Sequence, residues 1–253
     1  MKTLLITQAR FGSTRLPGKV LKEIGGKTLL QIHLDRLAKC KEVGNILVAT
    51  TDQKDDEKIS ALAKQLNFSV YRGSEKDVLD RFYQAAKPYQ PDFIIRVTSD
   101  CPLIDPLLVD EVIKCTILHD ADYGSNTLVE HFPDGQDVEV FKFKALEAAW
   151  NEATLPSERE HVTPYIRKNS SLSGGRFKSV NYPSPENFAK IRMTVDESKD
   201  FEMIKLVIEN QGTDKTWKEY TDYIIKNNLM AMNAEIIRNE GYLKSIKEDG
   251  KQI

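Results

Sequence analysis

The chain has 253 residues, of which 40% are hydrophobic and 29% are charged, and its formal net charge at pH 7 is −2. This length is enough for one large α/β domain or for a domain with an appendage, and the composition is ordinary for a soluble globular protein. Such a small net charge produces no global field that would attract nucleic acid or an anionic membrane surface. No apolar run approaches the roughly 20 residues that a membrane-spanning helix requires, so we expect neither nucleic acid nor a membrane as a partner.

The cysteines and the first residues of the chain predict a cytoplasmic protein. Cys40, Cys101 and Cys115 form no Cys-x-x-Cys pair, and their odd number argues against a disulfide framework and for a reducing compartment. The apolar run that follows Lys2 is too short for a secretory signal, and no small-residue cleavage site comes after it.

The first strand leads into a loop that carries three cations. Residues 4–6 are apolar and predict a buried strand, and leucines at helical spacing predict a helix over 28–40. Between them lie two glycines with Arg10, Arg15 and Lys19. Glycine lets the backbone approach an anion, arginine forks onto two oxygens and lysine acts as a point charge, so this layout predicts a phosphate-binding corner. The spacing matches neither common nucleotide-binding fingerprint, which leaves a surface loop with solvated cations as the alternative.

Strands and helices alternate along the rest of the chain, which predicts βαβ units in a largely parallel α/β sheet. Strands are expected at 45–50, 68–71, 92–97, 137–141, 177–182 and 190–195. Helices are expected at 55–66, from 77, from 106, at 144–153, from 157, after 198 and from 215, with a last helix or short strand at 234–242. Right-handed crossovers then place the loop ends of the parallel strands along one edge, where open α/β sheets bind their ligands.

Two aspartates follow predicted strands directly. Asp105 has a sufficient structural explanation as the N-cap of a helix with Pro106 at its first position. Asp100 has none, and a carboxylate just past a buried strand suits a hard cation. Asp196 stands in the same relation to the strand at 190–195, and acids at two strand ends can converge on one ion.

Three further groups of polar residues have structural alternatives. The pair Asp120-x-Asp122 has the form of a glycosyltransferase metal motif, but it lies at a helix end and is interpreted as a polar turn. Asp137 and Glu139 lie on one side of an alternating strand, where they face either solvent or a ligand. The stretch from Glu158 to His161 has the charge pattern of an ion-paired helix start.

Several segments together resemble one family. Ala9-Arg10-x-x-Ser13-Thr14-Arg15-Leu16-Pro17-Gly18-Lys19 is similar to the nucleotide-binding signature of the sugar-acid cytidylyltransferases, which include the CMP-Kdo and CMP-acylneuraminate synthetases. It is most similar to the spore-coat polysaccharide biosynthesis F proteins among their relatives. Segments that begin at Gly73, Ser99, Asp134, Glu158 and Arg192 continue the resemblance, which covers about the first 210 residues.

The resemblance implies a Rossmann-like, three-layer α/β nucleotidyltransferase fold over residues 1–210, with a mostly parallel mixed sheet flanked by helices. Within it, residues 125–185 are expected to bind the acceptor and to form a homodimer contact, and residues 211–253 to be a C-terminal helical extension. The implied reaction is Mg²⁺-dependent: a sugar acid or related acceptor attacks CTP, which gives a CMP- or CDP-linked product and pyrophosphate for surface polysaccharide biosynthesis.

The resemblance also implies residue roles. Catalysis is assigned to Arg10, Arg15, Lys19 and Asp100, and Mg²⁺ binding to Asp100 and Asp196. Nucleotide binding is assigned to Gln8, Ala9, Arg10, Ser13, Lys19, Arg72 and Ser74, and acceptor binding to Asp137, Glu139, Arg159 and His161. Two alternatives stay open: a nucleotide-sugar-dependent glycosyltransferase that uses Asp120 and Asp122, and a non-catalytic nucleotide-binding protein.

Overall fold

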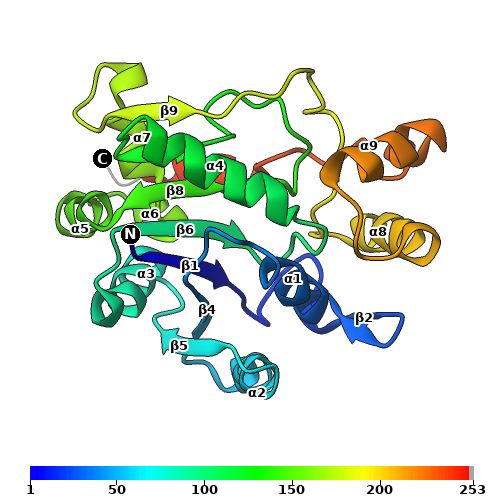
Figure 1. Ribbon diagram of the computed structural model, residues 1–253. Helices are drawn as coiled ribbons and strands as arrows, with labels where there is room; N and C mark the ends of the chain where they lie inside the picture. Colours follow the sequence, from blue (N-terminus) through cyan, green and yellow to red (C-terminus); the bar gives the residue numbers. More distant parts are fainter. Residues whose placement is uncertain (251–253) are drawn as a thin grey trace.

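The computed structural model describes residues 1–250, and a seven-stranded sheet runs through its centre (Figure 1). The strands are β1 (Thr3–Gln8), β4 (Asn45–Thr51), β5 (Ser69–Gly73), β6 (Phe93–Thr98), β7 (Tyr123–Ser125), β8 (Glu139–Lys142) and β9 (Ser179–Asn181). Their order across the sheet is β5-β4-β1-β6-β8-β7-β9. Only β8 runs antiparallel to its neighbours within this sheet, which confirms the mostly parallel mixed sheet that the sequence predicts.

The helices of the described part occupy the positions between these strands and the C-terminal region. They are α1 (Leu29–Leu37), α2 (Glu57–Gln65), α3 (Val78–Ala86), α4 (Pro106–Leu118), α5 (Phe143–Glu152), α6 (Pro156–His161), α7 (Pro164–Lys168), α8 (Ser198–Gln211), α9 (Trp217–Lys226) and α10 (Glu240–Asp249). A small hairpin, β2 (Glu23–Ile24) with β3 (Lys27–Thr28), precedes α1. Short 3-10 turns include η1 (Lys19–Leu21) and η5 (Leu229–Met232).

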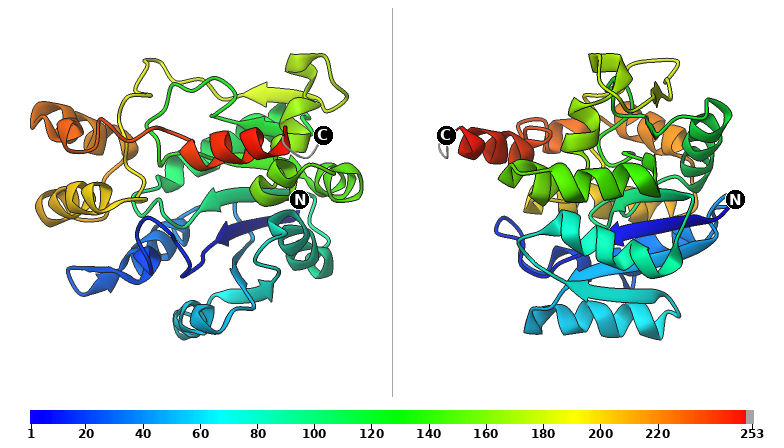
Figure 2. Two further views of the ribbon diagram at one scale, coloured as in Figure 1. Left: turned by 180° about the vertical axis from the view of Figure 1, so that it is seen from behind. Right: turned by 90° about the vertical axis from the view of Figure 1, so that its left-hand side faces the viewer.

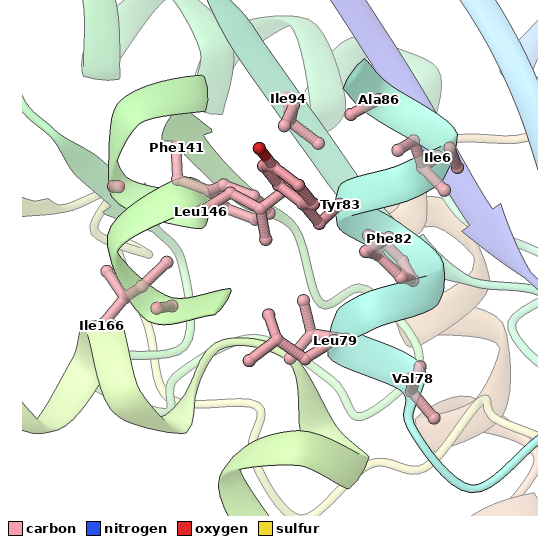
Figure 3. Packing of buried hydrophobic residues seen from close by; sticks show 14 of the residues in the cluster. Ile6, Val78, Leu79, Phe82, Tyr83, Ala86, Ile94, Phe141, Leu146 and Ile166 are labelled. Carbon is pink, nitrogen blue, oxygen red and sulfur yellow. The ribbon is translucent and has the colours of Figure 1, made fainter. Parts of the chain in front are cut away.

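Helices cover both faces of the sheet, which gives the three layers expected. Successive residues of β1 alternate between the faces: Leu4 and Ile6 join an apolar cluster with α3 and α5, whereas Leu5 joins a cluster with α4. Figure 3 shows Phe82 of α3 and Leu146 of α5 in the first cluster. Burying one such side chain stabilises the fold by ~1.5–3 kcal/mol. Each face of β1 therefore has to be covered by apolar helix side chains, which α3 and α5 supply on one face and α4 on the other.

Asp105 confirms its predicted role and has a second one. Its Oδ1 accepts a hydrogen bond of 2.9 Å from Leu107 N at the start of α4, where Pro106 is the first helical residue. Its Oδ2 accepts a hydrogen bond of 2.7 Å from Trp217 N, so the same carboxylate also fixes the start of α9.

The segment 190–195 is not a strand, which corrects the prediction. Its backbone bonds to two loops instead: Met193 N donates to Asp134 O at 2.7 Å, and Val195 N donates to Asp100 O at 2.8 Å. The side chains of Met193 and Val195 pack in the apolar cluster built on α8 and α9. Apolar residues alternate in this segment as they would in a strand, but here they pack against the helices α8 and α9.

Two more predictions need correction. The helix expected from residue 157 ends at His161, because Val162 has a φ of 72°, and a new helix starts at Pro164. The residues after the predicted polar turn form β7, a short strand between β8 and β9 that the sequence analysis did not identify.

The C-terminal region divides between two parts of the molecule. Tyr220 and Ile224 of α9 are fully buried in one apolar cluster with Met203 and Ile204 of α8. The last helix is α10, which begins only at Glu240 and lies alongside α6 (Figure 2). The proposed boundary at residue 210 remains a prediction. Among the helices described, none combines the length and the apolar character that crossing a lipid bilayer demands.

Candidate functional site

Lys19 brings together the two aspartates that follow the predicted strands. Its Nζ lies 2.7 Å from Asp100 Oδ2 and 2.8 Å from Asp196 Oδ1. Asp100 follows β6, which runs parallel to β1, so the carboxyl ends of both strands lie at one edge of the sheet (Figure 1). Asp196 reaches the same edge from the segment before α8. The two acids, which the sequence analysis expects to share a metal ion, therefore both contact the Lys19 ammonium.

The loop that carries Lys19 is held by a turn at Gly18. Gly18 has a φ of 66°, and a Cβ atom there would lie 2.8 Å from the Phe11 ring. Gly18 N donates to Phe11 O at 2.9 Å, and Ser13 Oγ accepts from Leu16 N at 3.3 Å. Because a side chain at position 18 would meet both strain and steric overlap, glycine is required for the close turn that directs Lys19 to the acids.

The charges of this group support one another. Burial opposes the charged form of Lys19, but Asp100 and Asp196 outweigh it and raise the pKa of the lysine. Burial also opposes the charged form of Asp100, yet the Lys19 ammonium and its hydrogen bond hold the pKa of this carboxyl well below its usual range. The cation and Asp100 are therefore both charged at neutral pH.

A cavity of about 450 Å³ opens beside Lys19, and we call it the loop pocket. Its lining includes Gln8, Ala9, Arg10, Ser13, Arg15, Lys19, Arg81, Thr98, Ser99 and Asp100. Gln8 Oε1 is buried without a hydrogen-bond partner among the described residues. Burial and the nearby Arg10 lower the pKa of Arg81 to about 10. Several cations and an unsatisfied acceptor thus face one cavity.

A second cavity of about 260 Å³ adjoins the first, and we call it the strand pocket. Its lining includes Arg96, Thr127, Asp134, Asp137, Glu139, Thr163 and Arg167. Arg15, Asp100 and Asp196 line both pockets. The two acids therefore stand at the boundary between the two cavities, where groups bound in each would meet.

Glu139 and Asp137 both line the strand pocket but differ in charge state. Glu139 accepts hydrogen bonds from Arg96 at 2.5 Å, Tyr123 at 2.6 Å and Thr163 at 2.7 Å. Burial opposes its charge, but the charges of Arg96 and Arg167, together with the hydrogen bonds from Thr163 and Tyr123, lower the pKa of this carboxyl. For Asp137, burial outweighs the guanidinium of Arg238 at 2.8 Å and raises the pKa to about 7.

Two arginines that line the strand pocket have guanidinium N–H groups without a hydrogen-bond partner in the described structure. Arg167 donates a single long bond of 3.4 Å to Thr127 O, and it forms no ion pair with a carboxylate among residues 1–250. Arg96 pairs with Glu139, but its Nε is buried without a partner in the described structure. Arg167 is therefore the arginine of this pocket whose donors are available to an anionic group, whereas Arg96 is committed to Glu139.

Three residues with an implied binding role lie outside both linings. Arg72 donates to Thr51 O at 3.1 Å and to Gln53 O at 3.0 Å. Ser74 Oγ accepts from Asp77 N at 3.0 Å at the start of α3. Arg159 pairs with Asp77 at 2.6 Å and donates to Trp150 O, which joins α6 to α3 and α5. Each of them makes local structural contacts.

The pair Asp120 and Asp122 also lies outside both pockets. Both carboxylates contact Lys142 Nζ, at 2.9 Å and 3.1 Å. Asp120 has a φ of 45°, which agrees with the turn that the sequence predicts.

α10 carries no recognisable sequence motif, yet its residues Glu240, Lys244 and Glu248 line the loop pocket. Glu240 pairs with Arg15 at 3.2 Å. His161, which lines both pockets, bonds through Nε2 to Ser245 Oγ at 3.1 Å, and burial lowers the pKa of its imidazole. No sequence motif marks these contacts, because they join segments far apart in the chain.

Comparison with known proteins agrees with this geometry. Residues 4–240 match the family described as cytidylyltransferase. The chain is 45% identical to an uncharacterised protein of Methanocaldococcus jannaschii, over 96% of this chain and 98% of that protein. It is 37% identical to the spore coat polysaccharide biosynthesis protein SpsF of Bacillus subtilis, over 83% and 87% of the two chains. The solved structure of a cytidylyltransferase from Leptospira borgpetersenii superimposes with a TM-score of 0.87 at 35% identity, covering 94% of this chain and 100% of that one.

Proposed function

The chain belongs to the cytidylyltransferase family, and we propose that it transfers a cytidylyl group from CTP to a hydroxyl of a sugar acid, with release of pyrophosphate. One observation carries this proposal. Lys19, Asp100 and Asp196 meet at the boundary between a cationic pocket and a second pocket that has free arginine donors. Such a boundary suits in-line transfer between a triphosphate on one side and an acceptor on the other.

The loop pocket supports binding of the triphosphate. Arg10, Arg15 and Lys19 offset the negative charge of the phosphates, and Gln8 Oε1 accepts an N–H of the bound nucleotide. The acceptor hydroxyl loses its proton to solvent as its oxygen attacks the α-phosphorus, and the bond to the oxygen that bridges the α- and β-phosphorus breaks, so that pyrophosphate leaves with the electron pair. The protein's part is to hold these groups in line and to stabilise the charge that grows on the leaving group.

Asp100 and Asp196 are the residues that would hold Mg²⁺. The two carboxylates already share one cation, the Lys19 ammonium, and carboxylate oxygens are the donors that Mg²⁺ prefers. No cluster of three or more such protein ligands occurs in residues 1–250, which agrees with an ion completed by water and substrate phosphates. When bound, Mg²⁺ would polarise the phosphate and lower the pKa of the acceptor hydroxyl.

The strand pocket supports an anionic acceptor. Arg167, which pairs with no carboxylate in the described structure, presents donors in a fork that matches the two oxygens of a carboxylate. Asp137 and Glu139 add acceptors for hydroxyl groups on the same wall. A small molecule with one acid group and several hydroxyls, such as a sugar acid, fits this set of partners.

The name of one relative supports a proposal for the biological setting. The name of the Bacillus subtilis relative concerns spore coat polysaccharide. On this basis we propose that the present chain acts in the cytoplasm in the biosynthesis of a surface polysaccharide. We also propose a homodimer in which residues 125–185 form the contact. Size-exclusion chromatography with light scattering measures the oligomeric state.

Pyrophosphate release tests the proposed reaction. The four nucleoside triphosphates are offered with Mg²⁺ and a panel of sugar acids, and CTP with one acid is expected to give turnover. K19A and D100N are expected to lower kcat by about a hundredfold or more. Rates in these variants equal to the wild type would refute the assignment.

Release of a nucleoside diphosphate from a sugar nucleotide would favour a glycosyltransferase, but Asp120 and Asp122 lie outside both pockets.

A further inference from the structure

Arg192 lies in the irregular segment before α8, surrounded by three carboxylates. Its Nη1 bonds to Asp134 Oδ2 at 2.5 Å, its Nη2 to Asp196 Oδ2 at 2.7 Å, and its Nε to Asp200 Oδ1 at 2.9 Å. The side chain of Arg192 is only 7% exposed. A buried cation with this many charged partners has one fixed orientation, because the planar guanidinium must satisfy all of them together.

The two oxygens of Asp196 are divided between Arg192 and the site. Oδ2 contacts Arg192, whereas Oδ1 contacts Lys19 at 2.8 Å and Arg15 at 3.0 Å. Arg192 therefore determines which oxygen of Asp196 faces Asp100.

The backbone of this segment is held in the same network. Asp200 Oδ2 accepts from Asp196 N at 2.9 Å and from Glu197 N at 3.1 Å. Asn233 Nδ2 donates to Asp200 Oδ1 at 2.9 Å. Asp200 thus holds the main chain of Asp196 while Arg192 holds its side chain.

We propose that Arg192, supported by Asp200, is a positioning residue that presents Asp196 Oδ1 to the divalent ion shared with Asp100. The inference rests on the proposed function, since it concerns the same ion. A carboxylate with one oxygen fixed by a guanidinium offers the other as a monodentate ligand at a defined place. Loss of such an outer partner typically weakens metal binding by about 10–100-fold.

A purely structural role for Arg192 makes a different prediction, and Arg36 supplies the matched control. Arg36 is also buried, and it donates to three backbone carbonyls, of Ile104 at 2.6 Å, of Lys215 at 2.9 Å and of Thr213. It lies outside the linings of both pockets. R36K therefore removes a buried forked guanidinium, as R192K does, but leaves the aspartates of the site untouched.

The experiment measures binding of Mn²⁺, as a paramagnetic probe, to the full-length protein with CTP and without acceptor. We expect R192K to raise the Kd for Mn²⁺ by about 10–100-fold, and R36K to leave it within twofold of the wild type while lowering Tm. If R192K does not fold, D200N, which keeps the arginine and the side-chain volume, serves in its place, and a Kd raised severalfold is expected.

The outcomes separate the two proposals. A folded R192K or D200N with a Kd within twofold of the wild type would overturn the positioning role and leave the proposed function standing. An equal rise of Kd in R36K would also overturn the positioning role, because it would show a general effect of lost stability. A wild-type protein that binds neither Mn²⁺ nor CTP would overturn both.

Discussion

Arg15 and Glu240 lie 3.2 Å apart, so a residue of the first loop and a residue of the last helix form an ion pair at the mouth of the loop pocket. The same guanidinium also contacts Asp196 at 3.0 Å. Glu197 lies 3.7 Å from it as well, so a triphosphate that binds in this pocket must compete with three carboxylates for one arginine.

This competition predicts that E240Q binds CTP more tightly. The amide keeps the size of the side chain but removes a negative charge beside the phosphates, so KM for CTP should fall severalfold with little change in kcat. The control is E235Q, since Glu235 pairs with Lys199 and lies outside both linings. A higher KM in E240Q would mean that Glu240 assists binding of the nucleotide.

The ammonium group of Lys19 lies between Asp100 and Asp196, in the position where a divalent ion would bind both carboxylates. We expect Mg²⁺ to raise the Tm of K19M more than that of the wild type, because the variant leaves both carboxylates without their cation. Differential scanning fluorimetry with and without Mg²⁺ measures the shift. An equal shift in both proteins would show that Mg²⁺ stabilises the fold at another place.

Arg167 is expected to act on the acceptor alone. R167Q removes a charged donor from the strand pocket, and a lost hydrogen bond to a carboxylate costs ~1.5–3 kcal/mol, so KM for the acceptor should rise by about 10–100-fold. The KM for CTP should stay close to that of the wild type. R176Q is the control, because Arg176 pairs with Glu152 on the surface outside both pockets. A rise in the KM for CTP alone would place Arg167 on the nucleotide side.

Asp137 gives the fold a dependence on pH. Its pKa is raised from 3.8 to about 7 by burial, so the folded chain binds a proton that the unfolded chain has already released between these two values. The stability that this proton supplies is complete below pH 3.8 and is lost as the pH rises through about 7. Relative to the wild type, D137N should therefore gain stability from pH 5 to pH 8, by ~1 kcal/mol or more. Urea unfolding at the two pH values tests this, and a constant difference between the proteins would contradict it.

Asp105 is predicted to stabilise two helices at once. D105A removes the N-cap of α4 and the acceptor of Trp217 N, and the loss of a cap alone costs about 0.5–2 kcal/mol. The partly buried N–H of Trp217, left without its acceptor, should add to this cost. We expect the free energy of unfolding to fall by ~2–3 kcal/mol, with D105N closer to the wild type because its amide oxygen still accepts. A loss below 0.5 kcal/mol would be inconsistent with the double role.

The part of the site nearest the sheet follows from the sequence, because it depends on regular geometry. A strand, a glycine turn and a helix position Lys19, and the end of a parallel neighbouring strand positions Asp100. Asp196 lies beside Asp100 as predicted, but it does not follow a strand. The segment before it packs on α8, and this packing positions the aspartate. The convergence of the acids was thus predictable, although one of its structural grounds was wrong.

The rest of the site depends on contacts that no local pattern records. Arg72 and Arg159 carry the charges of binding residues, yet nearby carbonyls and Asp77 take their donors. Arg167 looks like an ordinary surface cation in the sequence, and Arg192 stands out only as the start of a segment of resemblance. Only the packing of distant segments shows that Arg192 is enclosed by acids and that Arg167 faces a cavity.

The polar attachment of α10 has a last consequence. Only Ser245 and Asp249 of this helix are buried, whereas Leu243 and Ile246 are 46% and 43% exposed. Ser157 and Glu160 of α6 hold the helix through hydrogen bonds to those two buried residues. A helix that is held mainly by ion pairs and hydrogen bonds, with few buried apolar side chains, detaches at a much lower free-energy cost than global unfolding requires. Salt screens the ion pairs and lowers this cost further. We therefore expect the wall that α10 gives the loop pocket to open at lower cost than the walls built on the sheet, and more often at high ionic strength.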